Sequence, residues 1–205
     1  AAKTMNPRLG IVDGVSILGT RGTVVPYSKE SYRETIRMGL DVAVSRGLTE
    51  IALSTGGRSE RLLSAHLPQL PRHGFVQIAD FFAFSLEEAA ARDFRTIYLS
   101  VFFGKLVKMA QGHSYTHAKV SRIDFSRLAD WCRQAGVEGR IADSVHGANT
   151  ARHALELLKE SPASHRLVAE TCRRARERAA AFVGQAPEIV YYVFDFDEEL
   201  VYRCG

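Results

Sequence analysis

The chain has 205 residues, of which 46% are apolar and 24% charged, and its formal net charge is +4. This length suits one α/β domain, alone or with an appendage, and is enough to bury a substantial core. We find no apolar run near the roughly 20 residues of a membrane-spanning helix and no signal peptide in residues 1–10, so we expect a cytoplasmic protein with no membrane partner. The mild positive charge would suit an acidic ligand or a nucleic acid and does not choose between them.

The cysteines are Cys132, Cys172 and Cys204. They are far apart, odd in number and match no zinc-binding spacing. We therefore expect reduced thiols, as in a cytosolic protein, and no protein metal site.

Short β-type runs alternate with helical stretches in the first half of the chain. The expected strands are 15–18, 51–54, 75–79 and 96–101, and the expected helices are 29–46, 60–66, 85–92 and 105–110. Ser28 is a suitable N-cap for the first of these helices. Its buried stripe should hold Tyr32, Ile36, Leu40 and Ala43.

The second half begins less clearly, because residues 113–122 show no period. Residues 137–141 could be a weak strand or an extended connection. Helices are expected at 125–134, 150–159 and 167–182, and a β-hairpin at 188–194 and 200–202 with its turn at 195–198. The basic run 172–178 lies opposite the apolar stripe of its helix and has no interleaved aromatic residues, so a solvated face is favoured over nucleic-acid binding.

This alternation predicts a three-layer α/β/α fold of Rossmann-like type, with a mainly parallel sheet and a C-terminal hairpin, as a single domain over residues 1–205. In such sheets the ligand lies at the carboxyl ends of the strands. Glycine-rich turns that lead into helices recur at these ends, which is the clearest physical sign of a ligand site.

Two of these turns can approach a ligand closely, because glycine lets the backbone come near it. Gly19, Thr20, Arg21 and Gly22 follow the first expected strand, and a plain turn there competes with a ligand loop. The second turn is Thr55-Gly56-Gly57-Arg58-Ser59-Glu60. Its arginine could pair with a carboxylate, and its glutamate could accept from ribose hydroxyls or stabilise the helix N-terminus.

Further polar residues follow the other strands. Asp80 could bind hydroxyl groups or act as a base, or it could cap the next helix. Lys105 and Lys108, after Gly104, could bind an anion or form a solvated face. His113 and His117 are four apart, and they could be structural, catalytic or in contact with the substrate or, less readily, bind a metal together.

Three segments carry a resemblance to a known family. Residues 3–22, with the run Ile17-Leu18-Gly19-Thr20, are similar to the family's ISILGTTG region, residues 104–117 to its GKL-K-A-G segment and following histidine, and residues 195–200 to its closing hairpin. The chain resembles the C-terminal domain of cobalt-precorrin-5B C1-methyltransferases, enzymes of cobalamin biosynthesis. It departs from them at Arg21 and in the turn 54–58, where the family has a small residue and a T-P-G type turn.

The resemblance implies methyl transfer from S-adenosylmethionine to C1 of cobalt-precorrin-5B, with the cobalt belonging to the substrate. It also implies a longer family chain, whose N-terminal domain would be the partner of this one, and it leaves a homo-oligomer open. On the turns described above, His117 and Asp80 would then be the candidate catalytic residues, and Arg21, Arg58, Lys105 and Lys108 would bind the carboxylated macrocycle. The cofactor would contact Gly19, Thr20, Gly22, Thr55, Gly56, Gly57, Glu60, Asp80 and Gly104.

Two other classes of function stay open at this point. A nicotinamide-dependent oxidoreductase could use a similar fold, although residues 54–58 lack the acidic residue expected after its second strand. A non-catalytic half that only binds the cofactor or the tetrapyrrole is the other alternative.

Overall fold

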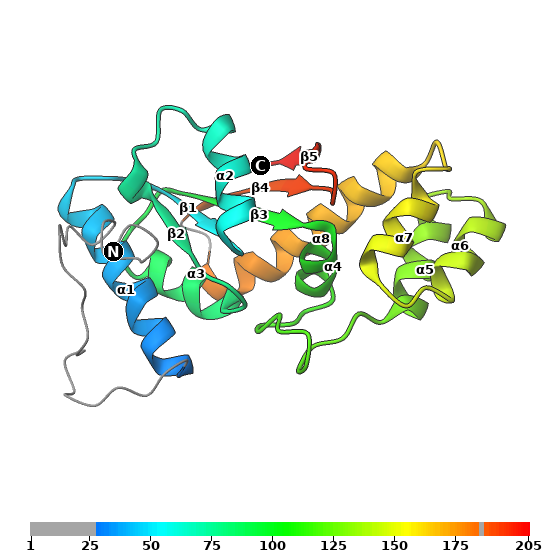
Figure 1. Cartoon of the computed structure of the whole chain (residues 1–205), viewed down its shortest axis with the longest axis horizontal. Helices are drawn as coiled ribbons and strands as arrows, with labels where there is room; N and C mark the ends of the chain where they lie inside the picture. The colour runs from blue at the N-terminus through cyan, green and yellow to red at the C-terminus, as the bar shows by residue number, and fades with distance from the viewer. Residues whose placement is uncertain (1–27, 185–186) are drawn as a thin grey trace.

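A computed structural model describes residues 28–184 and 187–205. Its sheet has the strand order β2-β1-β3-β4-β5 (Figure 1). The strands are Glu50–Ser54 (β1), Phe75–Gln77 (β2), Thr96–Phe102 (β3), Glu188–Phe194 (β4) and Leu200–Cys204 (β5). The first four are parallel neighbours, and β5 is antiparallel to β4. The predicted α/β fold with its C-terminal hairpin is therefore confirmed, while the expected strand 15–18 lies outside the described residues.

Alternating side chains of the strands face two different sets of helices. On one face, Ile51, Leu53 and Tyr191 join the core that packs against α1 (Lys29–Ser45), α3 (Phe82–Ala90), α4 (Phe103–Ala110) and α8 (Ser164–Val183). On the other face, Ala52 and Phe194 pack with Leu63 of α2 (Gly57–His66). The period-two alternation of buried strand residues thus produces the three layers.

The first helix follows its sequence pattern closely. Ser28 is the N-cap and its side chain accepts a hydrogen bond from Ser31 N, as expected. Ile36, Leu40 and Ala43 are buried. Because the apolar residues recur at helical spacing, the opposite face is left for charged side chains.

Three short helices form a unit beside the end of α8 (Figure 1), namely α5 (Phe125–Gln134), α6 (Gly139–His146) and α7 (Ala151–Leu158). The interpretation of residues 137–141 as a strand or extended connection holds for the connection 137–138 and is wrong from residue 139, where α6 begins. Ile141, Ala142 and Val145 are the buried side chains of α6, and their spacing is helical. Among the described helices, none is long and apolar enough to cross a membrane.

The expectation of three reduced cysteines is also wrong. Cys172 of α8 and Cys204 of β5 form a disulfide, although 32 positions separate them in the sequence. The third cysteine, Cys132, is free and buried, and burial raises the pKa of its thiol to about 12. Sequence spacing could not reveal this pair, because its proximity comes from the packing of the last strand on the long helix.

These cysteines give a direct test of the fold. We expect the native chain to react with no thiol reagent at neutral pH, because the free Cys132 thiol is buried and protonated. The unfolded, unreduced chain should show one thiol, and the reduced chain all three cysteines. Three reactive thiols before reduction would contradict the disulfide.

Gly104 lets two helices approach each other. A Cβ added there would lie 2.8 Å from Cβ of Ala151, the first residue of α7. We therefore expect Gly104→Ala to lower the free energy of unfolding by about 1–3 kcal/mol in urea titrations, because the helices must separate. Gly139→Ala is the matched control, since a Cβ there meets nothing within 4 Å. Equal stability of the two variants would argue against the close α4–α7 contact.

Candidate functional site

The parallel strands bring their carboxyl ends to one edge of the sheet. There β1 leads into Thr55, β2 into Asp80, β3 into Gly104 and Lys105 of α4, and β4 into Asp195. This is the edge at which ligands bind in such sheets, and turns predicted separately from sequence meet there.

Asp80 is the centre of a polar cluster that ties three segments together. Its Oδ1 atom accepts hydrogen bonds from Lys105 Nζ at 2.8 Å and from Thr116 Oγ1 at 3.0 Å. Lys105 Nζ also donates to the Ala79 carbonyl at 2.7 Å, and Thr116 N donates to the Asp80 carbonyl at 3.0 Å. Asp80 does not cap α3, because the N-cap position belongs to Phe81. The alternative that Asp80 is only a helix cap is therefore excluded.

The backbone before Asp80 adopts a conformation that non-glycine residues rarely use. Ala79 has φ of 47°, in the left-handed region. The hydrogen bond from Lys105 to the Ala79 carbonyl helps to hold this turn. Strained backbone of this kind gathers at functional sites, where the surrounding contacts must stabilise it.

Opposing effects set the charge of this cluster. Burial raises the pKa of Asp80, but the hydrogen bond and charge of Lys105, the hydrogen bond of Thr116 and the charge of His117 outweigh it, so the net pKa is lowered. Burial, with the charge of Lys105, lowers the pKa of Lys108 despite the opposing charge of Asp80. Asp80 is consequently a firm anion and a weak base.

His117 lies on the loop that Thr116 fastens to Asp80. Its Nδ1 atom accepts a hydrogen bond from Lys119 N at 3.2 Å, which leaves Nε2 to carry the proton of the neutral ring. The ring stacks on Tyr115 with centroids 6.0 Å apart. His113 makes a separate contact, with Nε2 3.0 Å from the Arg122 carbonyl oxygen. The residues that the structure describes contain no group of three metal-ligating side chains.

The turn after β1 exposes its backbone at the same edge. Gly56 is extended, with φ of 163°, and a Cβ added there would meet nothing within 4 Å. A Cβ on Gly57 would make only an ordinary contact, 3.6 Å from Gln77 Nε2. Helix α2 also begins without a side-chain cap. Neither glycine is required by the fold itself, which leaves room for close approach of a ligand to the first turn of α2.

The side chains around this turn fasten it to the sheet. Thr55 N donates to the Ser100 carbonyl at 3.3 Å, and Ser100 Oγ donates to the Ser59 carbonyl at 2.7 Å. Ser54 Oγ makes a longer contact of 3.4 Å with Glu60 Oε2. Thr55, Gly56, Gly57 and Glu60 are thus brought together as predicted, and their role in cofactor binding stays a prediction.

A pocket of about 600 Å³ lies beside the Asp80 cluster. Lys105, Lys108 and Arg122 contribute cations to its wall, and the apolar lining includes Phe102 and Phe196. Gly104 also lines it, although its close contact with Ala151 gives this glycine a packing role of its own. An apolar pocket with several cations suits a large apolar ligand that carries carboxylates.

Arg58 is engaged within the protein. Its Nε atom donates to Glu198 Oε1 at 2.8 Å, its Nη2 atom donates to the Phe196 carbonyl, and its guanidinium lies over the Phe102 ring at 5.0 Å. Arg58 therefore links α2 to the β4–β5 hairpin. A substrate carboxylate would have to compete with Glu198 for it.

The sequence interpretation missed some residues, and others cannot be placed. Gly19, Thr20, Arg21 and Gly22 lie outside the described residues. Thr116 was not recognised as the partner of Asp80, because no local pattern joins positions so far apart. The cations Lys29, Arg33 and Arg37 were missed although their spacing of four places them on one face of α1.

Comparisons with known proteins agree with the resemblance seen in the sequence. The family model described as "CbiD, C-terminal domain" matches residues 115–205, and the model "CbiD" matches residues 1–26. No solved structure matches the chain.

Three relatives are named cobalt-precorrin-5B C(1)-methyltransferase. The protein of Nitratidesulfovibrio vulgaris is 47% identical over 95% of this chain and 50% of its own length. The proteins of Thermus thermophilus and Leptospira interrogans are 37% and 35% identical, over 97% and 100% of this chain and 54% and 55% of their own lengths.

The chain thus spans about half the length of the curated relatives that it matches. The similarity extends over nearly all of its residues, including the Asp80 turn and α4. The chain therefore belongs to the CbiD family, whose curated members carry the name cobalt-precorrin-5B C(1)-methyltransferase.

Proposed function

We propose that this chain takes part in methylating C1 of cobalt-precorrin-5B, giving cobalt-precorrin-6A in cobalamin biosynthesis, with S-adenosylmethionine as the methyl donor. The observation that carries the proposal is the 47% identity, over 95% of the chain, to a protein with that name. The activity is proposed from relatives that are about twice as long as this chain. A cytoplasmic location stays a prediction, and the Cys172–Cys204 disulfide does not favour it.

The turn after β1 is the proposed cofactor site. Gly56 and Gly57 present backbone N–H groups at the start of α2, and Glu60 is the nearby carboxylate that could accept from ribose hydroxyls. Backbone donors and the helix dipole suit the carboxylate end of an amino-acid cofactor. The sulfonium supplies an already activated methyl group, so the chief task of the protein is alignment.

The pocket beside α4 is the proposed place for part of the macrocycle. Lys108 and Arg122 at its wall would bind carboxylates, and Phe102 and Phe196 would lie against the ring system. Lys105 already neutralises Asp80, whereas Lys108 Nζ donates to the uncharged Thr116 carbonyl at 2.8 Å, so the charge of Lys108 is the more available to the substrate. The different roles of Lys105 and Lys108 thus follow from the carboxylate partner that Lys105 has in the chain.

In the reaction the ring carbon would form a bond to the methyl carbon while the sulfur–methyl bond breaks and S-adenosylhomocysteine leaves. Any proton that the methylated ring loses would pass to a base of the protein. His117 is the proposed proton acceptor, because Thr116 ties the loop that carries it to Asp80; its Nδ1 atom would take the proton in place of the hydrogen bond from Lys119 N. Asp80 itself is assigned an anchoring role, since its lowered pKa makes it a poor base at neutral pH.

Calorimetric titration with S-adenosylhomocysteine, with NADH as the comparison ligand, tests the cofactor site. We expect saturable binding of the homocysteine product and none of NADH. Gly56→Val should abolish this binding with little change in stability, because an added side chain meets open space in the fold and would fill the space of the ligand.

The matched control is Gly139→Val, which places the same side chain in open space on α6 and should bind normally. If the wild-type chain does not bind the homocysteine product at millimolar concentration, the self-contained cofactor site is refuted. Binding of NADH instead would favour an oxidoreductase.

The Asp80–Lys105 pair predicts a pH-dependent stability. Asp80→Asn should lower the free energy of unfolding at pH 7 by about 1–3 kcal/mol. The charge-assisted hydrogen bond from Lys105 is lost, and the Lys105 ammonium is left without its counter-charge. A carboxyl whose pKa is lowered in the folded state stabilises the fold above its unfolded pKa of about 3.9, and this contribution disappears as the pH falls through the folded value.

The difference between Asp80→Asn and wild type, followed by urea unfolding, should therefore shrink below about pH 4. Asp130→Asn is the control, because its pair with Arg133 is exposed and should contribute less than about 1 kcal/mol. A difference that stays constant down to pH 2 would contradict the assigned ion pair.

A further inference from the structure

A second hollow, of about 690 Å³, lies on the other side of the loop that carries His117. Ser114 and Tyr115 of this loop line it, whereas Ala118 and Ser121 of the same loop line the first pocket. The remaining wall comes from α1, from α3 and the preceding Phe81, and from Phe182 of α8. The candidate catalytic loop therefore separates two hollows.

Cations of α1 and aromatic rings face each other in this second hollow. Lys29 Nζ lies 4.9 Å from the centroid of the Tyr115 ring. The Arg33 guanidinium lies 5.6 Å and 5.2 Å from the rings of Phe81 and Phe84. Flat apolar surface beside positive charge suits a planar ligand that carries carboxylates.

The rings form a continuous path to the candidate catalytic histidine. Phe84 and Phe81 have centroids 6.4 Å apart, Phe81 and Tyr115 5.1 Å, and Tyr115 and His117 6.0 Å. A ligand that lies along these rings would extend from Arg33 to the Asp80–His117 centre.

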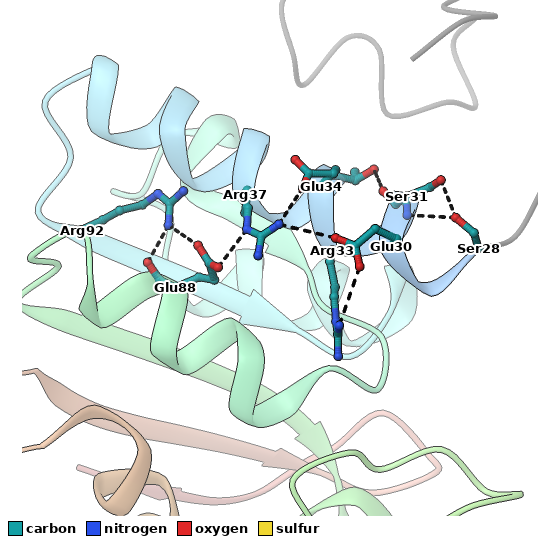
Figure 2. Close-up of polar contacts among 9 residues, drawn as sticks. Ser28, Glu30, Ser31, Arg33, Glu34, Arg37, Glu88 and Arg92 are labelled. Atoms are coloured by element: carbon teal, nitrogen blue, oxygen red, sulfur yellow. Dashed lines mark hydrogen bonds and ion pairs between the residues drawn. The ribbon is translucent and has the colours of Figure 1, made fainter. Parts of the chain in front are cut away.

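Two neighbouring arginines of α1 differ in what they bind (Figure 2). Arg37 donates to Glu34 at 2.6 Å and to Glu88 at 2.8 Å, and Glu88 also accepts from Arg92, so this chain of charges braces α1 against α3. Arg33 joins this network only through longer contacts of Glu30, whose carboxylate lies 3.8 Å from Arg33 Nη1 and 3.7 Å from Arg37 Nη1.

The Nε atom of Arg33 is a hydrogen-bond donor without an acceptor among the described residues. This atom is also buried. A buried donor of a charged group is costly when it is left unsatisfied. The ion pair of Arg33 with Glu30, at 3.8 Å, is longer than those of Arg37 with Glu34 and Glu88, at 2.6 and 2.8 Å, so a ligand carboxylate at Arg33 would compete with a weaker partner.

Acidic side chains also line the hollow and limit what it can bind. Glu88 is compensated by Arg37 and Arg92, and its pKa is lowered by their hydrogen bonds and charges although burial opposes them. Glu87 is exposed at the wall and would repel a second anion close to it. The balance suits one carboxylate arm at Arg33 rather than many.

We propose that Arg33 and Lys29, above the Phe84–Phe81–Tyr115 rings, bind a carboxylate arm and an edge of the tetrapyrrole-derived macrocycle. This inference rests on the proposed function and assigns part of the substrate site to a hollow and a helix that the sequence did not point to. The macrocycle then lies across the His117 loop, with other arms towards Lys108 and Arg122 in the first pocket.

Titrations with two soluble corrinoids test this proposal. Dicyanocobyrinic acid carries free carboxylates, and dicyanocobinamide has the same ring with the side chains as amides. We expect Arg33→Gln to weaken binding of the acid about tenfold, the loss of one charge-assisted pair, and to leave binding of the amide unchanged. Arg133→Gln is the control, because it removes an arginine of α5 that is paired with Asp130 and Asp143 and is not part of this wall, and it should change either affinity less than twofold.

Titration of the same variants with S-adenosylhomocysteine separates the two proposals. Loss of acid binding in Arg33→Gln with normal binding of the homocysteine product supports the arm site. Equal affinity of wild type and Arg33→Gln for the acid overturns it, even where the cofactor binds and the proposed function stands. No binding of the acid to the wild-type chain would overturn both the arm site and the substrate part of the proposed function.

Discussion

Lys105 reaches from α4 across the edge of the sheet to the turn that follows β2, where Nζ donates both to the Ala79 carbonyl and to the Asp80 carboxylate. The same carboxylate receives Thr116, so a strand end, a helix and an irregular loop converge on one anion. The placement of His117 depends on this convergence, because the loop has no regular secondary structure of its own. The two hollows depend on it too, since the loop is the wall between them.

Glycines in this molecule serve two different purposes, and the structure separates them. At Gly104 the neighbouring helix leaves no room for a side chain, so packing alone explains the residue. At Gly56 the fold leaves open space and an ordinary extended backbone, so packing does not explain it. Both positions were candidate cofactor contacts in the sequence, and the surrounding atoms distinguish them.

The sequence predicted well whatever depends on local pattern. Helix 125–134 and strand 188–194 were predicted with their observed bounds, because each has a clear period and clear end signals. Residues 139–141 were misread because Gly136 and Gly139 interrupt the pattern there, which hid the helical spacing of Ile141, Ala142 and Val145. Asp80 and Lys105 could be found because each follows a strand. Thr116 and Arg33 could not be assigned, because their roles come from contacts between distant segments.

The wall that α7 contributes to the first pocket is fixed from two directions. Ala151 at its start packs against Gly104, and Lys159 just beyond its end forms ion pairs with Asp195 and Asp197 of the hairpin. Asp195 is itself buried and accepts from the backbone of its own turn. The opposite wall, residues 118–122, has mostly exposed side chains. A bulky substrate would therefore enter past this exposed segment, and the rate of its entry and release would depend on that stretch of loop rather than on the helices.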